Sequence, residues 1–257
     1  MGGHRHHGEA PVGVTLQFLG CGDAFGSGGR LQTCLHLPTD EGGLLLDCGA
    51  SSLIALKRAG VDPASIGWIA LTHLHGDHFG GIPFLVLDGQ FNRRQRPLVI
   101  AGPPGVRARV EAAMEVFFPG STRVERRFAV EFVELADRRP ADVAGARVTA
   151  FTVEHASGAP AYALRVEYGA RTVTYSGDTE WTEALVDAAR EADCFVCEAY
   201  TFDRKVRFHL DYATVCAEAA RFRARRIVLT HMGPSMLERR GEAAFECASD
   251  GLVLTVE

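Results

Sequence analysis

The sequence has no apolar run that approaches the ~20 residues needed to cross a bilayer, so we expect no membrane-spanning segment. Its first residues, MGGHRHHGEAP, lack the apolar core of a secretory signal. We therefore expect residues 1–12 to be a short disordered tail whose histidines have no fixed role. The expected location is cytoplasmic.

Lysine is scarce, since Lys57 and Lys205 are the two in the chain, and arginine carries nearly all of the positive charge. Small arginine clusters occur at 92–96 (NRRQR) and 221–226 (RFRARR). Such clusters are more typical of solvated helix faces and loops than of phosphate sites. The formal net charge of −5 also disfavours a large polyanionic partner, because phosphate contacts dominate nucleic-acid affinity.

The seven cysteines are an odd number scattered along the chain, which argues against a disulfide framework and for a reducing compartment. Cys194 and Cys197 in CFVC have the spacing of a redox or zinc motif. However, they lie in an apolar run typical of a strand, where residues three apart point to opposite faces. We expect both thiols to be buried and structural.

Short apolar or β-branched runs bounded by glycine, proline, aspartate or charged residues predict strands. They span 14–20, 44–49, 68–73, 97–102, 130–135, 147–155, 161–168, 171–178, 194–199, 226–231 and 252–257. Helical patterns cover 51–60, 103–118, 179–193 and 211–225. No low-complexity linker divides the chain. We expect one α/β domain over 13–257, with two sheets and helices packed outside them.

The segment LTHLHGDHFG, at 71–80, places His73, His75, Asp77 and His78 within six positions, directly after a predicted strand. A lone histidine is usually structural. Four residues of metal-ligand type this close together are hard to explain in that way.

Three further residues, His155, Asp178 and His231, also follow predicted strands. Ligand sites in open α/β sheets form at the carboxyl ends of strands, where loops bring distant residues to one point. Five imidazoles and two carboxylates in all are the right number for two divalent ions. A nitrogen and oxygen set without thiolate suits zinc, with manganese or iron(II) as alternatives.

The pattern H-x-H-x-D-H followed by FGG resembles the signature of the metallo-β-lactamase superfamily. The chain from Val14 to Glu257 is most similar to the ribonuclease Z branch, through LGCGDAFG, LLLDCG, RPLVIAGPPG, YSGDT and, more weakly, LTHMGPSM. The resemblance implies a four-layer αββα sandwich in a single domain. It also implies that one ion is held by His73, His75 and His155, the other by Asp77, His78 and His231, with Asp178 bridging them.

Two further residues gain meaning from this resemblance. Glu198 in VCEAY and His209 in FHLDY are similar to the paired acid and histidine of that branch, and with Asp77 they are the expected catalytic residues. A histidine titrates near neutrality and is suited to protonate a leaving group. Asp47, which follows a strand, either orients a ligand histidine or shapes a turn.

The chemistry expected of such a centre is metal-dependent ester hydrolysis. Two ions ~3.5–4 Å apart share a hydroxide, because metal binding lowers the pKa of water to about 7. Ribonuclease Z enzymes usually carry a long tRNA-gripping arm between the ligands that correspond to His155 and Asp178, but here that interval is 22 residues. We therefore favour a small phosphodiester, such as a cyclic nucleotide, over tRNA.

Alternatives remain. The first is tRNA 3′-processing, with an arm supplied by a partner in a homodimer. The same metals would also serve an aryl sulfate, phosphotriester or lactone hydrolase, whereas a redox di-iron or persulfide-oxidising enzyme would need iron. A non-catalytic scaffold would tolerate missing ligands, and none is missing. The expected partner is a small-molecule ester; nucleic acid is not favoured and a homodimer is left open.

Overall fold

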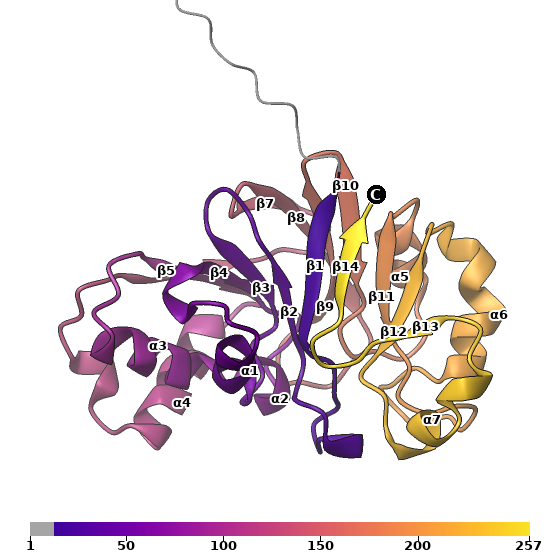
Figure 1. The fold of residues 1–257 in the computed structure, drawn as a ribbon, viewed down its shortest axis with the longest axis horizontal. Coiled ribbons are helices and arrows are strands. Elements are labelled where there is room, and N and C mark those ends of the chain that lie inside the picture. The colour runs from indigo at the N-terminus through magenta and orange to yellow at the C-terminus, as the bar shows by residue number, and fades with distance from the viewer. Residues whose placement is uncertain (1–12) are drawn as a thin grey trace, which may run out of the picture.

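The computed structural model describes residues 13–257, so the tail expected over 1–12 and its histidines lie outside the described residues. Residues 13–257 form two seven-stranded sheets that pack face to face. The order of strands is β14-β1-β2-β3-β4-β5-β6 in the first sheet and β13-β12-β11-β10-β9-β8-β7 in the second. Helices α1–α4 lie on one side of the pair, and α6 and α7 lie on the other (Figure 1).

The strands of the first sheet are β1 (Val14–Gly20), β2 (Cys34–Leu37), β3 (Gly43–Leu46), β4 (Ile66–Ala70), β5 (Leu98–Gly102), β6 (Val130–Glu134) and β14 (Val253–Val256). Those of the second are β7 (Pro140–Val143), β8 (Ala146–Val153), β9 (Ala161–Tyr168), β10 (Arg171–Tyr175), β11 (Cys194–Glu198), β12 (Ile227–Thr230) and β13 (Glu246–Cys247). The α-helices are α1 (Ser52–Arg58), α2 (Gly76–Phe79), α3 (Ile82–Phe91), α4 (Val106–Phe117), α5 (Glu183–Ala189), α6 (Tyr212–Phe222) and α7 (Pro234–Glu238).

Three apolar clusters hold these layers together. One lies between the sheets and includes Phe18 and Leu164. A second packs the first sheet against α1, α3 and α4 and includes Leu56, and a third packs the second sheet against α5–α7 and includes Phe222. Central strands are buried on both faces, which explains their continuous apolar runs. The expected four-layer αββα sandwich is confirmed.

The two thiols of CFVC lie on opposite faces of β11, as expected. Cys194 belongs to the cluster between the sheets and Cys197 to the cluster under the outer helices, and both are buried. All seven cysteines are free thiols. Within residues 13–257 no helix is long and apolar enough to cross a membrane.

The direction of the strands sets where the site forms. In the second sheet, β8 and β10 are both antiparallel to β9, and β10, β11 and β12 are parallel, so β8, β10 and β12 end at the same edge. In the first sheet, β4 is parallel to its neighbours β3 and β5. The loops that follow these strands carry the residues expected to bind metal.

Candidate metal centre

The H-x-H-x-D-H segment changes from extended loop to helix in its middle. Strand β4 ends at Ala70 and α2 begins at Gly76, so His73 and His75 lie on the loop while Asp77 and His78 lie on the first helical turn. The backbone N–H of His78 donates to the carbonyl of His75 (3.0 Å), which starts that turn. This change of backbone direction turns all four side chains toward one point.

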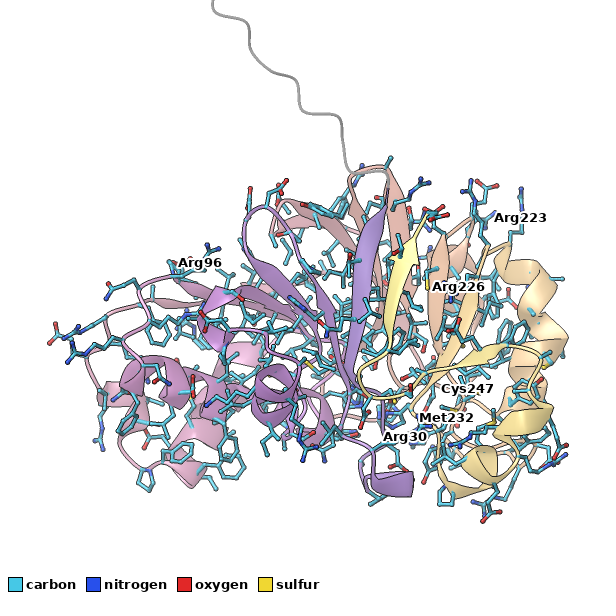
Figure 2. All side chains as sticks on the ribbon, viewed as in Figure 1. Arg30, Arg96, Arg223, Arg226, Met232 and Cys247 are labelled. Carbon is cyan, nitrogen blue, oxygen red and sulfur yellow. The ribbon has the colours of Figure 1, made fainter. Side chains whose placement is uncertain are left out.

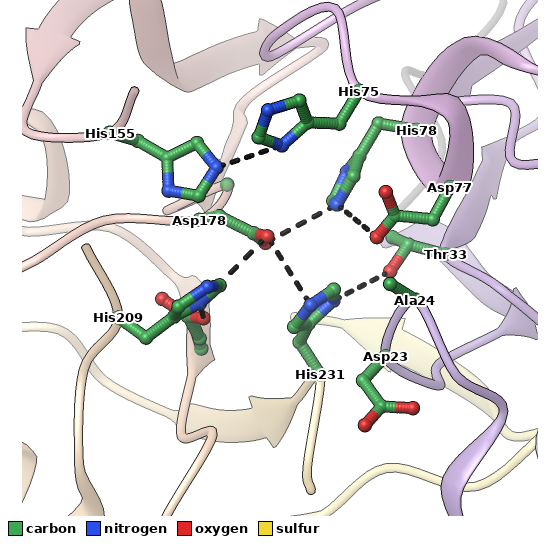
Figure 3. Close-up of polar contacts among 12 residues, drawn as sticks. Asp23, Ala24, Thr33, His75, Asp77, His78, His155, Asp178, His209 and His231 are labelled. Carbon is green, nitrogen blue, oxygen red and sulfur yellow. Dashed lines mark hydrogen bonds and ion pairs between the residues drawn. The ribbon is translucent and has the colours of Figure 1, made fainter. Parts of the chain in front are cut away.

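The seven residues expected to bind metal come together in two groups, and in each the potential ligand atoms lie within 4.8 Å of one another. One group contains His73, His75 and His155. The other contains Asp77, His78, Asp178 and His231. Figure 3 shows the side chains of both groups other than His73, which come from the loops of both sheets, around a common centre.

Asp178 is placed to reach both groups. Its Oδ1 lies 3.3 Å from Nε2 of His78, and its Oδ2 lies 3.3 Å from Nε2 of His231. The same Oδ2 lies 4.0 Å from Nε2 of His73, which belongs to the other group. The division of ligands implied by the sequence is therefore compatible with the geometry.

The buried polar atoms of the centre indicate that a cation fits there. In residues 13–257, Nε2 of His73, Nε2 of His78 and Oδ1 of Asp178 are among the buried atoms without a hydrogen-bond partner. Leaving such atoms unsatisfied is costly, and native proteins rarely do so without a ligand, ion or water. These atoms converge, and their donor types suit divalent ions, so the residues present fit a binuclear metal centre.

Most of the imidazoles use one ring nitrogen for protein contacts and turn the other toward the centre. The Nδ1 contacts are His73 with Thr72 Oγ1 (3.0 Å), His78 with Asp47 Oδ2 (2.7 Å), His155 with the Phe208 carbonyl (2.9 Å) and His231 with Thr33 Oγ1 (3.4 Å). His75 differs, since its Nδ1 faces Nε2 of His155 at 3.1 Å. Such outer contacts fix the ring orientation and tautomer of ligand histidines.

Asp47 combines the two roles that the sequence left open. It is fully buried with φ of 59°, so it shapes the turn after β3. Its carboxylate accepts hydrogen bonds from the N–H (2.8 Å) and hydroxyl (2.8 Å) of Thr72 and contacts His78. Because Thr72 in turn contacts His73, this carboxylate supports one histidine of each ligand group.

Burial and nearby charge set the protonation of these rings. Burial lowers the pKa of His73 well below its usual value and also lowers that of His155, so both rings are neutral and able to bind metal. Burial also acts against a charged His78, but Asp178, Asp47 and Asp77 outweigh it and raise its pKa well above the usual value.

Glu198 and His209 form a pair beside the second ligand group. Glu198 ends β11, is fully buried, and accepts hydrogen bonds from the N–H groups of Thr179 (2.9 Å) and Leu210 (3.2 Å) and from Nδ1 of His209. Although burial lowers the pKa of His209, the hydrogen bond and charge of Glu198 outweigh it and raise the pKa to about 9. Glu198 is thus occupied by protein donors, while Nε2 of His209 is left for a ligand.

A cavity of about 200 Å³ opens onto this centre. It is lined by Ala24, Phe25, His75, Asp77, His155, Asp178, Tyr200, His209 and His231. Sequence reasoning missed Phe25 and Tyr200. Phe25 lies within LGCGDAFG and Tyr200 within VCEAY, two segments that resemble ribonuclease Z enzymes, so the sequence held a signal for both positions.

The arginine clusters do not flank this cavity. In Figure 2, Arg96, Arg223 and Arg226 lie away from Met232, which directly follows His231, one of the expected ligands. Arg223 and Arg226 form ion pairs with Glu191 and Glu246. The expectation that the clusters cover solvated surface agrees with the contacts of Arg223 and Arg226, but it is wrong for Arg94, which is buried.

Another member of the cluster at 92–96 serves the fold. Arg94 is buried and donates to the backbone carbonyls of Pro63, Ile66, Arg96 and Pro97.

The fold and the ligand set define a metal-dependent hydrolase of the metallo-β-lactamase superfamily, of ribonuclease Z type. Residues 14–248 match the family model described as Anti-Pycsar protein Apyc1, and the chain belongs to that family.

Relatives and solved structures agree with this class. A ribonuclease Z from Agathobacter rectalis is 26% identical over 81% of this chain and 84% of its own. The crystal structure of the short form of human tRNase Z is 25% identical, with a TM-score of 0.76, over 95% of this chain and 99% of that one. The metallo-β-lactamase fold protein YhfI from Bacillus subtilis has a TM-score of 0.74 at 20% identity, over 95% and 99% of the two chains.

Proposed function

We propose that the protein is a phosphodiesterase that hydrolyses a small phosphodiester, such as a cyclic nucleotide, with two zinc ions. The observation that carries the proposal is the 200 Å³ cavity, which brings the two ligand groups and the His209–Glu198 pair to one surface. Manganese or iron would suit the same nitrogen and oxygen donors.

The absence of an inserted arm at the usual position supports a small substrate. The interval between His155 and Asp178 holds the paired strands β9 and β10 and their connections. With its arginine clusters directed elsewhere and a net charge of −5, the chain offers little for a long polyanion to bind.

In this proposal, His73, His75 and His155 would hold one ion, Asp77, His78 and His231 would hold the other, and Asp178 would contribute to both sites. When bound, two such ions would supply an activated water and polarise the non-bridging phosphate oxygens.

The protein's own part in the reaction is to deliver a proton. Glu198 holds Nδ1 of His209, so Nε2 of the same ring presents a proton to the departing oxygen. Bound cations would offset the influence of Asp178 on His209, so Glu198 is the partner that keeps the ring protonated near neutral pH.

The second candidate is tRNA 3′-processing, which the relatives named ribonuclease Z favour. The two candidates differ in the size of substrate. The test is to incubate the metal-loaded protein with bis-p-nitrophenyl phosphate, with 3′,5′-cyclic nucleotides, and with precursor tRNA that carries a 3′ trailer.

We expect hydrolysis of the small esters and little cleavage of the tRNA. Trimming of the tRNA at the discriminator base would favour the second candidate. A phosphodiester turnover no greater than that of metal-free protein would contradict the proposal, and an aryl sulfate, phosphotriester and lactone panel would then identify the reaction. Elemental analysis of the protein as purified distinguishes zinc from manganese and iron.

A further inference from the structure

The backbone of Phe208 supports one of the expected metal ligands. Its carbonyl accepts a hydrogen bond from Nδ1 of His155 (2.9 Å), so the ring carries its proton on Nδ1 and keeps the lone pair of Nε2 for an ion. The next residue in the chain is His209, whose ring centroid lies 5.2 Å from that of His155. Figure 3 shows both rings beside Asp178. The position of Phe208 therefore affects an expected ligand and the expected proton donor together.

Phe208 has a backbone conformation that aromatic residues rarely adopt. Its φ is 69°, in the left-handed region where the Cβ crowds the following carbonyl oxygen. A residue keeps such a conformation only where its surroundings hold it, and such residues cluster at functional sites. The turn is closed by the N–H of His209, which donates to the carbonyl of Val206 (3.1 Å). Contacts from outside the turn also restrain Phe208.

Glu180 provides a contact of this kind. Its Oε1 accepts a hydrogen bond from the N–H of Phe208 (2.5 Å). The two peptide groups that flank the Cα of Phe208 are thus both in use, one with Glu180 and the other with His155. Only the two backbone dihedrals of Phe208 separate these rigid groups. Fixing the first peptide group therefore restrains the direction of the carbonyl that His155 contacts.

The backbone of Glu180 is itself anchored to the loop that carries His155. Its N–H donates to the carbonyl of Glu154 (3.0 Å), the residue directly before His155. The hydroxyl oxygen of Thr179 accepts from the N–H of Glu154 (3.1 Å), and the hydroxyl donates to the carbonyl of Glu180 (2.6 Å). Glu180 is thus fixed in the loop after β10, and its side chain reaches from there to the turn between β11 and α6.

We propose that Glu180 is a positioning residue, which holds the peptide of Phe208 so that His155 presents Nε2 to a metal ion and His209 faces the same centre. The inference rests on the proposed function, because it concerns a residue proposed there as a ligand and another proposed as the proton donor. Glu180 belongs to neither ligand group and acts through the backbone of Phe208. Its contribution is an acceptor oxygen at a fixed distance from the loop after β10.

The test compares Glu180→Gln with Glu180→Ala. Glutamine has the same length and keeps an acceptor oxygen for the N–H of Phe208, whereas alanine leaves that N–H without this acceptor. Competition with a chelator measures the affinity of each protein for zinc. Loss of an outer partner of a ligand histidine typically weakens metal binding about 10–100-fold. We expect a loss of this size for one of the two ions in Glu180→Ala, and unaltered affinity in Glu180→Gln.

The hydrolysis rate gives a second comparison. If Glu180→Ala also displaces His209, its rate at saturating zinc should fall more for an alkoxide leaving group than for p-nitrophenolate, which departs without a proton. Glu180→Gln should restore the rate for both leaving groups. A role in stability alone would not produce this dependence on the leaving group.

The matched control is Glu115→Ala. Glu115 also accepts hydrogen bonds from the backbone of a turn, from the N–H groups of Gly120 (2.8 Å) and Thr122 (3.1 Å). However, it lies on α4, belongs to neither ligand group and does not line the metal cavity. We expect this variant to unfold at lower urea concentration and to bind zinc as the unaltered protein does.

Two outcomes would overturn the inference. Equal zinc affinity of Glu180→Ala and the unaltered protein would show that His155 is held in place without Glu180. Equal weakening in Glu180→Gln and Glu180→Ala would show that the charge of Glu180 matters and its hydrogen bond does not. If the alanine variant does not fold, Glu180→Ser replaces it, since the serine hydroxyl is too short to reach the turn. Zinc binding is measured without substrate, so failure of the phosphodiesterase assay and failure of this comparison are separate results.

Discussion

Replacing Asp47 by Asn tests whether one buried carboxylate supports both metal sites. Asparagine has nearly the same shape and tolerates the φ of 59° at this position. However, an amide has one acceptor oxygen where the carboxylate has two. Asp47 uses its two oxygens for the N–H and hydroxyl of Thr72 and for Nδ1 of His78. The amide NH₂ must then face a group that is itself a donor.

The expected size of the effect follows from these contacts. One buried donor left without an acceptor costs about 1–3 kcal/mol of folding free energy. Loss of an outer partner of a ligand histidine typically weakens metal binding about 10–100-fold. Because Thr72 contacts His73 and Asp47 contacts His78, we expect both ions to bind more weakly.

Two measurements check this prediction: competition with a chelator for the bound metal, and urea unfolding of the metal-free protein. The control is Asp62→Asn, since Asp62 is an exposed residue that caps a turn through the N–H of Ala64 (2.9 Å), eleven positions before the first expected ligand. Asparagine caps as well as aspartate, so little change is expected there. Unaltered metal affinity in Asp47→Asn would refute the role assigned to this carboxylate.

Three further predictions follow from other contacts. Asp178→Ala removes the carboxylate that lies near both ligand groups, so inductively coupled plasma analysis should find fewer than two ions per chain; two tightly bound ions would show that it does not bridge. His209→Ala should keep both ions and lower the hydrolysis rate ~10²–10⁴-fold for alkoxide leaving groups but far less for p-nitrophenolate. Glu198→Gln should show a weaker form of the same pattern. A rate loss that does not depend on the leaving group would assign His209 to phosphate binding. Burial raises the pKa of Asp211, but hydrogen bonds from Lys205 and Thr214 outweigh it and hold that pKa below its usual value. The stability that this carboxylate contributes is therefore present above about pH 4 and is lost as the pH falls through the lower pKa of the folded state. Asp211→Ala should lower the unfolding free energy at pH 7 by about 0.5–2 kcal/mol and reduce its fall in acid, and an unchanged acid dependence in urea titrations would contradict this.

The positions of the expected ligands could be predicted because each follows an apolar run. His155, Asp178 and His231 come one to three residues after β8, β10 and β12, and the direction of these strands brings the loops together. A polar residue directly after a buried strand can be recognised in the sequence, and the geometry of the sheet then places such residues at one edge.

The partners of those ligands could not be predicted in the same way. The group that contacts His155 is the backbone carbonyl of Phe208, and every residue type has a carbonyl. Thr33 reaches His231 across 198 positions of the chain, a pairing that no local pattern encodes. Such contacts depend on how loops pack after the sheets have formed.

Three strands were also missed, for a local reason. Strand β7 begins with Pro140, has two exposed residues among its four and lies at the edge of its sheet, so its sequence lacks the apolar alternation that identifies strands. Strand β2 has four residues and β13 has two, so both are too short for an alternation of apolar and polar residues to be recognised.

The ligands expected at the metal centre come from both sheets, four from the segment after β4 and three from the loops after β8, β10 and β12. Ions bound by these residues would join residues 14–134 to residues 140–247 at one edge, as a reversible cross-link would. Its strength depends on the free metal concentration: an ion present at a hundred times its dissociation constant adds about 2.7 kcal/mol to the folded state. The concentration of free metal would then determine how firmly the two halves of the molecule are held together at the edge that carries the cavity.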